Sequence, residues 1–206
     1  MKPCQERDDK SQCVLDAATE VFLIHGFSAA STDMIQQKAG VSKATVYSRY
    51  PNKEALFAAV IDSACHRLMA CIEDQISAEF PLQESLPRFG RLYLEMLLSM
   101  EGLALFRLVV AEAIRFPYLA EQFYQAGPQR VVQLIEQQCE QAQARGELNF
   151  GDVAIHQVVA MFLSQLRGEL QLYALTHPQA ELTETMLQDQ LDLALKNFWQ
   201  SWSKKP

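Results

Sequence analysis

Two short runs with helical periodicity, separated by a glycine, constrain the fold of this chain more than any other feature. The first run, residues 31–39, opens on Ser31 and places its apolar side chains on one helical face. Gly40 predicts the end of that helix, because glycine reaches the left-handed backbone angle without steric cost. Ser42 can then cap a second short helix. The segment therefore predicts two short helices that meet at a sharp turn.

The second short helix is followed at once by a proline. Pro51 prevents it from continuing, and Asn52 is placed to cap a third helix that has Lys53 in its first turn. Val46 is expected to face inward, which leaves small, hydroxyl-bearing and cationic side chains on the outer face. Such a face suits the major groove of DNA. Residues 41–54 therefore predict a DNA-reading segment.

The order and spacing of these residues resemble a known family. A helix ends at Gly26, Ser-Thr follows at 31–32, and residues 39–56 read Ala-Gly-Val-Ser-Lys-x-Thr-x-Tyr-x-x-Tyr-x-x-Lys-Glu-x-Leu. This pattern is similar to the TetR family of bacterial transcriptional regulators, from about residue 8 to about residue 68. Ala44 stands where the family often has glycine, and Arg49-Tyr50 stand where it often has His-Phe.

The resemblance implies an all-α fold with double-stranded DNA as a partner. An N-terminal three-helix helix-turn-helix domain is expected over residues 8–68, with the helix-turn-helix at about 31–50. A larger helical effector-binding and dimerisation domain is expected over residues 69–206. Base-edge contacts are expected from Ala44 and Thr45, and mostly phosphate contacts from the other DNA-binding candidates. The full set is Ser31, Thr32, Ser42, Lys43, Ala44, Thr45, Tyr47, Arg49, Tyr50 and Lys53.

Charge is distributed in a way that agrees with DNA binding. The net charge is −7, but residues 1–60 contain seven Lys/Arg and seven Asp/Glu, so the rest of the chain carries the whole excess. Within residues 32–54 there are four Lys/Arg against two Asp/Glu, so this locally basic part of the N-terminal domain is still attracted to DNA, while an acidic body limits non-specific binding. Loss of the Lys53 amine is expected to weaken binding to every sequence and to flatten the salt dependence.

Helical periodicity continues through the rest of the chain, without strand alternation. The third helix of the head is expected to run on from Asn52 toward Ile76, and another to restart at Ser85. Residues 102–115 predict a helix buried on most of its sides. Asp152 is expected to cap a helix over roughly 153–175.

Thr183 is expected to cap the last helix, residues 184–202. The last two helices carry more apolar side chains than one narrow stripe, and in the family such helices pair in a four-helix dimer interface. We therefore expect a homodimer formed through them. The alternative is that they complete the core of a monomer.

Methionine and aromatic residues in the body are candidates for an effector pocket, with a few polar residues to orient an apolar or amphipathic ligand. The same residues at helical spacing are also typical of ordinary core. Arg115-Phe116-Pro117 and Gly127-Pro128 resemble the C-terminal domains of TetR-type repressors that control efflux pumps. The effector-binding candidates are Met96, Met100, Phe106, Glu112, Arg115, Phe116, Phe123, Tyr124, Phe162, Gln165 and Tyr173.

The leading hypothesis is a ligand-responsive homodimeric repressor that binds a palindromic operator and controls efflux or a neighbouring operon. A DNA-binding activator or adaptor without an effector is the alternative. An enzyme is disfavoured, because no HExxH, GxSxG or phosphate-loop motif is present and the four histidines are scattered. No cofactor is expected.

The five cysteines show no CxxC spacing, which disfavours a metal site and fits a reduced, cytoplasmic protein. Cys4 and Cys13 as a redox pair is an alternative to plain reduced thiols. No apolar run approaches the roughly 20 residues of a membrane span, so no membrane partner is expected.

Overall fold

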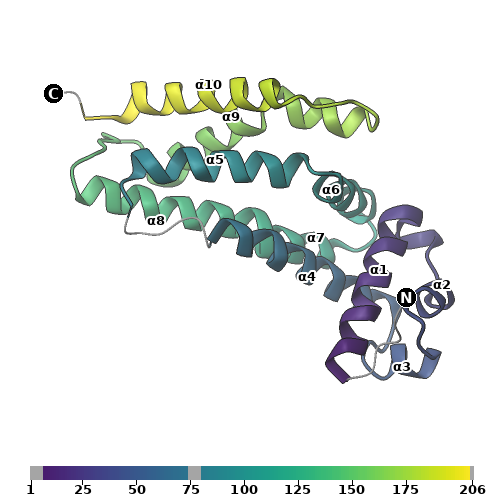
Figure 1. Cartoon of the computed structure of the whole chain (residues 1–206). Helices are drawn as coiled ribbons and strands as arrows, with labels where there is room; N and C mark the ends of the chain where they lie inside the picture. Colours follow the sequence, from purple (N-terminus) through teal and green to yellow (C-terminus); the bar gives the residue numbers. More distant parts are fainter. Residues whose placement is uncertain (1–6, 74–79, 205–206) are drawn as a thin grey trace. The chain divides into compact units, whose positions relative to one another are not determined.

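The computed structural model describes residues 7–73 and 80–204, and this part of the chain is built from α-helices (Figure 1). A single isolated β-bridge, between Leu148 and Ser203, is the only strand-like pairing in these two ranges. The all-α class expected from the sequence is confirmed. In chain order the helices are α1 (Arg7–Ala29), α2 (Thr32–Ala39), α3 (Lys43–Tyr47), α4 (Lys53–Glu73), α5 (Leu82–Leu98), α6 (Met100–Glu112), α7 (Pro117–Tyr124), the π-helical η1 (Gln125–Gln129), α8 (Arg130–Ala144), α9 (Ile155–Thr176) and α10 (Glu184–Trp202).

The chain folds into two compact units. The first contains the residues up to 67 together with residues 104–126, and the second contains residues 68–103 and those from 127 onward. The sequence had placed all of 69–206 in one domain, so the structure differs for 104–126. These residues join the first unit because Leu105, Leu108 and Leu119 are buried in its core.

An aromatic cluster forms the centre of the first unit. Phe22, Phe27 and Phe57 are buried, and their ring centroids lie 4.7–5.7 Å apart. The backbone of α1 leaves helical geometry at Gly26 (φ 75°), where the sequence predicted the helix to end, and Phe27 follows directly. Burying one such side chain contributes roughly 1.5–3 kcal/mol.

Helices α5, α8, α9 and α10 form the core of the second unit. Along α5 the buried residues follow the three- and four-residue spacing of an amphipathic helix. Phe89 stacks on Tyr93 with ring centroids 5.5 Å apart, and burial raises the pKa of the Tyr93 hydroxyl. Phe162 of α9 meets Phe198 of α10 edge to face.

Some helices begin where the sequence predicts, and others do not. Thr183 caps α10, as expected, because its hydroxyl accepts a hydrogen bond from the Met186 amide. The helix expected to restart at Ser85 already begins at Leu82, directly after a proline, and Ser85 is buried inside it. Asp152 does not cap the next helix, which begins at Ile155 without a side-chain capping bond. Beyond Glu73, the expected continuation of α4 lies outside the described residues.

Helix α6 is less buried than its composition predicts. It ends at Glu112, and although Leu103, Leu105, Leu108 and Val109 are buried, one face of it stays exposed. Val110 keeps 57% of its surface exposed, and Ile114, in the turn that follows, keeps 98%. The expectation of burial therefore fails for the face that carries Val110 and for the turn at Ile114, because a high apolar content does not by itself supply neighbours on every face.

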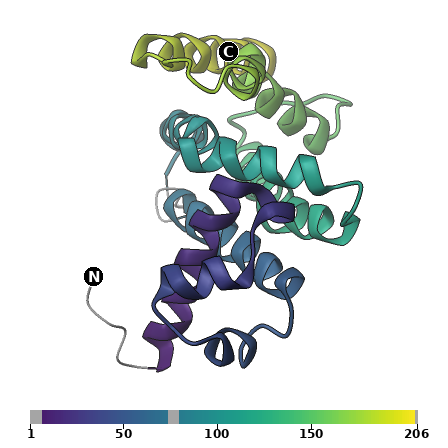
Figure 2. The same ribbon diagram turned by 90° about the vertical axis from the view of Figure 1, so that its right-hand side faces the viewer.

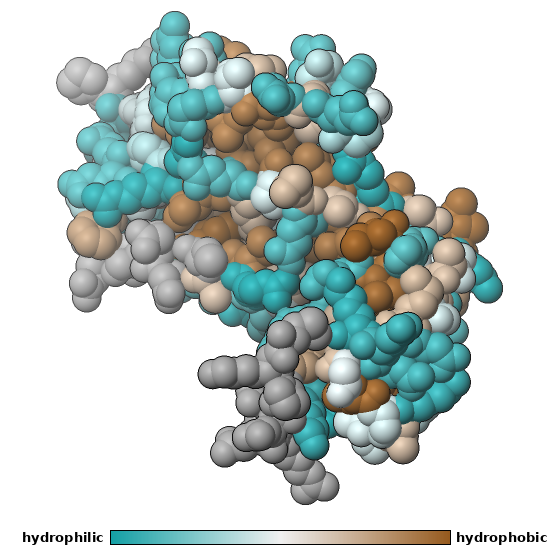
Figure 3. All heavy atoms as spheres, turned by 45° about the vertical axis from the view of Figure 1, so that its right-hand side comes forward, coloured by the Kyte–Doolittle hydropathy of each residue, from teal (hydrophilic) through white to brown (hydrophobic). Residues whose placement is uncertain are grey.

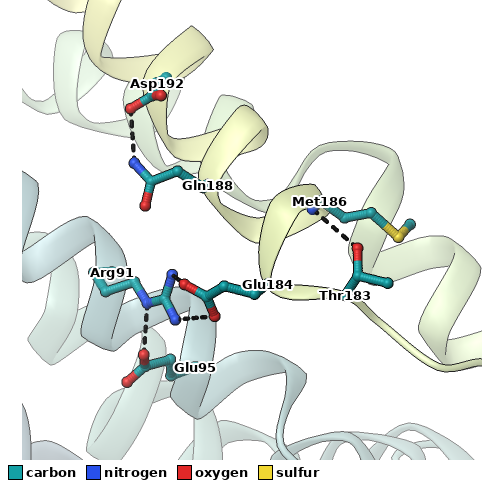
Figure 4. A network of polar contacts seen from close by, with 7 residues as sticks. All are labelled: Arg91, Glu95, Thr183, Glu184, Met186, Gln188 and Asp192. Carbon is teal, nitrogen blue, oxygen red and sulfur yellow. Dashed lines mark hydrogen bonds and ion pairs between the residues drawn. The ribbon is translucent and has the colours of Figure 1, made fainter.

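A polar network joins α5 to the first turn of α10 (Figure 4). Arg91 donates to Glu95 at 2.5 Å and to both carboxylate oxygens of Glu184. These hydrogen bonds from Arg91 lower the pKa of Glu184. Because the folded-state pKa is depressed, the stabilisation is present above the ordinary value of 4.5 and is lost as pH falls below it.

Helix α9 is broken near its middle. Gly168 has φ 47° and ψ −150°, a conformation that is essentially confined to glycine. The side-chain amide of Gln190, on α10, donates a hydrogen bond to the Gln165 carbonyl beside the break. A Cβ at residue 168 would lie 2.6 Å from the Gln190 amide nitrogen. Backbone geometry therefore requires glycine here, and a Cβ would also displace the Gln190 amide.

Replacing Gly168 with alanine is expected to lower the free energy of unfolding by about 2–3 kcal/mol, through backbone strain and displacement of Gln190. Gly151 is the matched control, because it has φ 55° but a Cβ there would meet nothing within 4 Å. Gly151→Ala should cost only about 1 kcal/mol. Urea unfolding followed by circular dichroism measures both variants, and equal losses would contradict a role for the Gln190 contact.

Candidate nucleic-acid interface

Helix α2 begins and ends as the sequence predicts. The Ser31 hydroxyl accepts a hydrogen bond from the Met34 amide at 3.2 Å, and Ile35 is completely buried. Gly40 adopts the left-handed conformation (φ 66°, ψ 31°) that ends the helix. The chain then turns sharply from α2, which packs against α1, into α3 (Figures 1 and 2).

Helix α3 is a short element fixed by one cap and one apolar anchor. The Ser42 hydroxyl accepts a hydrogen bond from the Thr45 amide at 3.2 Å, and Val46 is 1% exposed. Lys43, Ala44 and Tyr47 face solvent. The expected division of this helix into an inner Val46 and an outer polar face is confirmed.

Side-chain contacts between α2 and α3 hold the outer face in place. The hydroxyls of Thr32 and Tyr47 lie 3.1 Å apart, and the Lys43 ammonium donates to the Asp33 carboxylate at 2.8 Å. The hydrogen bond to Asp33 raises the pKa of Lys43. Asp33 was not among the residues expected from the sequence. Its position in the first turn of α2, ten residues before Lys43, gives no periodic signal by which to find it.

Lys53 is held by the protein itself. Asn52 caps α4, as expected, by accepting a hydrogen bond from the Ala55 amide at 2.7 Å. The Lys53 ammonium donates to the carbonyls of Phe27 and Ala30, at 2.8 and 2.9 Å, and lies 4.4 Å from the centre of the Phe27 ring. Two of its three N–H groups therefore cap the C-terminal end of α1, a structural role that the sequence did not predict.

Lys53→Met is therefore expected to destabilise the first unit by about 2–3 kcal/mol, because two hydrogen bonds from a charged donor are lost. Methionine keeps most of the apolar stem over Phe27. Lys43→Met is the control, since its partner Asp33 is exposed and the loss of this surface pair should leave stability essentially unchanged. Thermal unfolding compares the two, and equal stability would show that the carbonyl contacts contribute nothing.

Arg49 and Tyr50 are also turned partly toward the protein. Arg49 donates a hydrogen bond to the Ser11 hydroxyl at 3.0 Å, and half-buried Tyr50 packs against the core of the first unit. The candidates that are exposed or half-buried on the outer side of the turn form what we call the recognition face: Ser31, Thr32, Ser42, Lys43, Ala44, Thr45 and Tyr47.

The effector-binding candidates are divided between the two units. In the first unit, Phe106 meets Phe123, Phe116 packs on Phe27, and Tyr124 is exposed. Glu112 and Arg115 both hydrogen-bond to Ser28. In the second unit, Met96 lies against the core, Met100 is 91% exposed and Tyr173 stacks on His177.

Phe162 and Gln165, the remaining two candidates, lie in a groove between α9 and α10. The groove has a volume of about 310 Å³. Apolar side chains and several amide and hydroxyl groups line it: Val158, Met161, Phe162, Gln165, Asn197, Phe198, Ser201 and Trp202.

Two thiols are buried and unreactive. Burial raises the pKa of Cys65 and of Cys139 to about 12, so both stay protonated at neutral pH. Cys4 lies outside the described residues, and the redox-pair alternative remains a prediction. Within residues 7–73 and 80–204, no cluster of three or more His, Cys, Asp or Glu side chains could hold a metal ion. None of the helices described is long and apolar enough to cross a membrane.

Two capped helices around a left-handed glycine, with a polar outer face, define a helix-turn-helix DNA-binding protein. Family comparison agrees with this class. Residues 14–60 match the family described as bacterial regulatory proteins, tetR family, and residues 84–201 match the AefR-like transcriptional repressor C-terminal domain. The chain belongs to the TetR family of transcriptional regulators, and it is not an enzyme.

Solved structures of similar proteins cover nearly the whole chain. A TetR-family regulator from Mesorhizobium loti is 25% identical with a TM-score of 0.88, and the flavonoid-responsive regulator FrrA is 35% identical with a TM-score of 0.78. Each match covers 97% of this chain and 100% of the other.

Curated relatives match over shorter stretches. SrpR from Pseudomonas putida is 39% identical over 67 residues, 32% of each chain, and YhgD from Bacillus subtilis is 28% identical over 80 residues. The chain spans only 32% and 42% of the lengths of these two relatives.

Proposed function

We propose that the protein is a ligand-responsive homodimeric repressor that binds a palindromic operator with two recognition faces. The observation that carries the proposal is the capped α2–Gly40–α3 turn, which presents hydroxyl, methyl and ammonium groups on one exposed surface. In the cytoplasm, where a DNA-binding regulator acts, such a surface would meet duplex DNA.

Within the recognition face, short and long side chains take different roles. The Ala44 methyl and the Thr45 hydroxyl are placed for base edges, while Tyr47 and the start of α2 hold phosphates; the Lys43 ammonium is bonded to Asp33. Arg49, Tyr50 and Lys53 act mainly by positioning α3 and the end of α1, with any phosphate contact secondary to their contacts inside the protein.

The dimer forms through α9 and α10 in this proposal. TetR-family regulators dimerise, and these two helices leave large apolar side chains exposed. Met161, Leu172 and Tyr173 on α9 are 46%, 64% and 41% exposed, and Leu193 on α10 is 54% exposed. Hydrophobic groups reach the molecular surface in patches (Figure 3). A second copy of α9 and α10 would cover these four exposed side chains and the groove between the two helices.

The effector is an apolar or amphipathic small molecule, bound by a subset of the candidate residues named from the sequence. FrrA is described as flavonoid-responsive, which makes flat aromatic compounds a rational first panel. Release from DNA would then raise expression of a neighbouring gene, such as one for an efflux pump.

A selection experiment tests the function. Duplexes that the protein retains from a random-sequence pool should converge on a palindrome, and gel-shift titration should show specific binding. Flavonoids added to the complex should release the DNA. Retention of all sequences alike would contradict operator recognition, whereas specific binding that no compound in a broad apolar panel alters would favour a regulator without an effector.

A further inference from the structure

Every cation between residues 32 and 54 has an acceptor inside the first unit. Lys38 pairs with Glu20, Lys43 with Asp33, and Arg49 and Lys53 donate to a hydroxyl and to carbonyls. The number of Lys and Arg residues in this segment therefore overstates the positive charge that is available to DNA phosphates. Lys43 alone among them belongs to the recognition face.

Asp33 differs from the other acceptors in its position. It lies in the first turn of α2, next to Thr32 of the recognition face, and its side chain is 63% exposed. A phosphate that took the Lys43 ammonium away from Asp33 would leave this carboxylate unpaired beside a polyanion. Such like-charge juxtaposition is unfavourable, so the pair is expected to persist in the complex.

We propose that Asp33 is a positioning residue for specificity: its carboxylate keeps the Lys43 ammonium on the α2–α3 surface and withholds it from non-specific phosphate contacts. The proposal rests on the proposed function, since it needs a DNA complex. Thr32 supports the same arrangement, because its hydroxyl lies 3.1 Å from that of Tyr47 at the other end of α3.

The physical basis is the difference between the two kinds of DNA contact. Phosphate contacts add affinity for every sequence and steepen the salt dependence, whereas base contacts add affinity for one sequence. A lysine that is bonded to a carboxylate of its own chain contributes little to phosphate contacts. The recognition face then depends more on the hydroxyl and methyl groups of α3, and the ratio of specific to non-specific affinity rises.

Asp33→Asn is the direct test, with the palindrome selected by the wild-type protein and a scrambled duplex of the same composition as probes. The variant should bind the scrambled duplex about tenfold more tightly at low salt and the palindrome only about twofold more tightly. The slope of log K against log salt should steepen by about 0.9 per head, which is about 1.8 per dimer.

Two further variants separate positioning from general charge. Glu20→Gln removes the same charge and frees Lys38, which is outside the recognition face, so the specificity ratio should stay at the wild-type value. In a Lys43→Gln background, Asp33→Asn should change neither the slope nor the ratio, because its effect acts through the lysine. Thermal unfolding checks that all variants are folded.

Three outcomes would overturn the proposal. An unchanged slope and ratio in Asp33→Asn would mean that the pair does not restrain Lys43, and equal effects of Glu20→Gln would reduce the result to net charge. Weaker binding of the palindrome alone would make Asp33 a base reader, for example of a cytosine amino group. Absence of DNA binding by the wild-type protein would instead refute the proposed function itself.

Discussion

Leu172→Asp is expected to convert the dimer into monomers and to reduce affinity for the palindrome at least 100-fold. Leu172 is 64% exposed in the single chain, so the change should alter the stability of the fold by less than about 0.5 kcal/mol. In a pair of α9 and α10 helices, however, two aspartates would be buried without partners. Light scattering coupled to size-exclusion chromatography measures the mass.

The matched control is Ile114→Asp. Ile114 is even more exposed, at 98%, but it belongs to the first unit and not to α9 or α10. This variant should remain a dimer and bind the palindrome normally. A Leu172→Asp protein that stays dimeric would exclude the proposed interface, and a monomer that retained full affinity would exclude the need for two heads.

Phe57→Ala is expected to abolish DNA binding while leaving the dimer intact. Phe57 is fully buried between Phe22 and Phe27, and truncation of such a ring typically costs 3–5 kcal/mol. That is a large share of the stability of a domain of this size. The core of the second unit does not include these rings, so dimerisation through α9 and α10 should survive.

Proteolysis and gel-shift titration follow the two units separately. The first unit of Phe57→Ala should be cleaved rapidly and the second should persist, while Phe57→Leu, which keeps most of the volume, should retain binding. Full operator affinity in Phe57→Ala would contradict the view that the aromatic cluster supports the recognition face.

The turn could be predicted from the sequence because its signals are local. Ser31, Gly40, Ser42 and Asn52 each act on backbone within four residues, and each occupies the capping or turn role expected of it. Thr183, which caps α10, also acts on backbone close to it in the sequence. Asp152 and Ser85 were exceptions: Val153 and Ala154 intervene between Asp152 and the first helical residue, and Ser85 lies inside α5.

Residues whose role depends on a distant partner could not be predicted. Lys53 meets carbonyls 23 and 26 residues earlier, and Asp33 meets Lys43 across the turn. Periodicity also could not show that residues 104–126 pack with the head, because apolar spacing specifies a buried face but not the unit that covers it. The effector candidates are divided between the two units for the same reason.

The number of chains on one operator tests the central claim most directly. With the palindrome selected from a random pool, the mass of the complex should correspond to two chains, or a multiple of two, per duplex. Insertion of five base pairs between the half-sites should abolish binding, because it places the second half-site on the opposite side of the helix. One chain per duplex, or binding that tolerates the insertion, would contradict a two-headed reader.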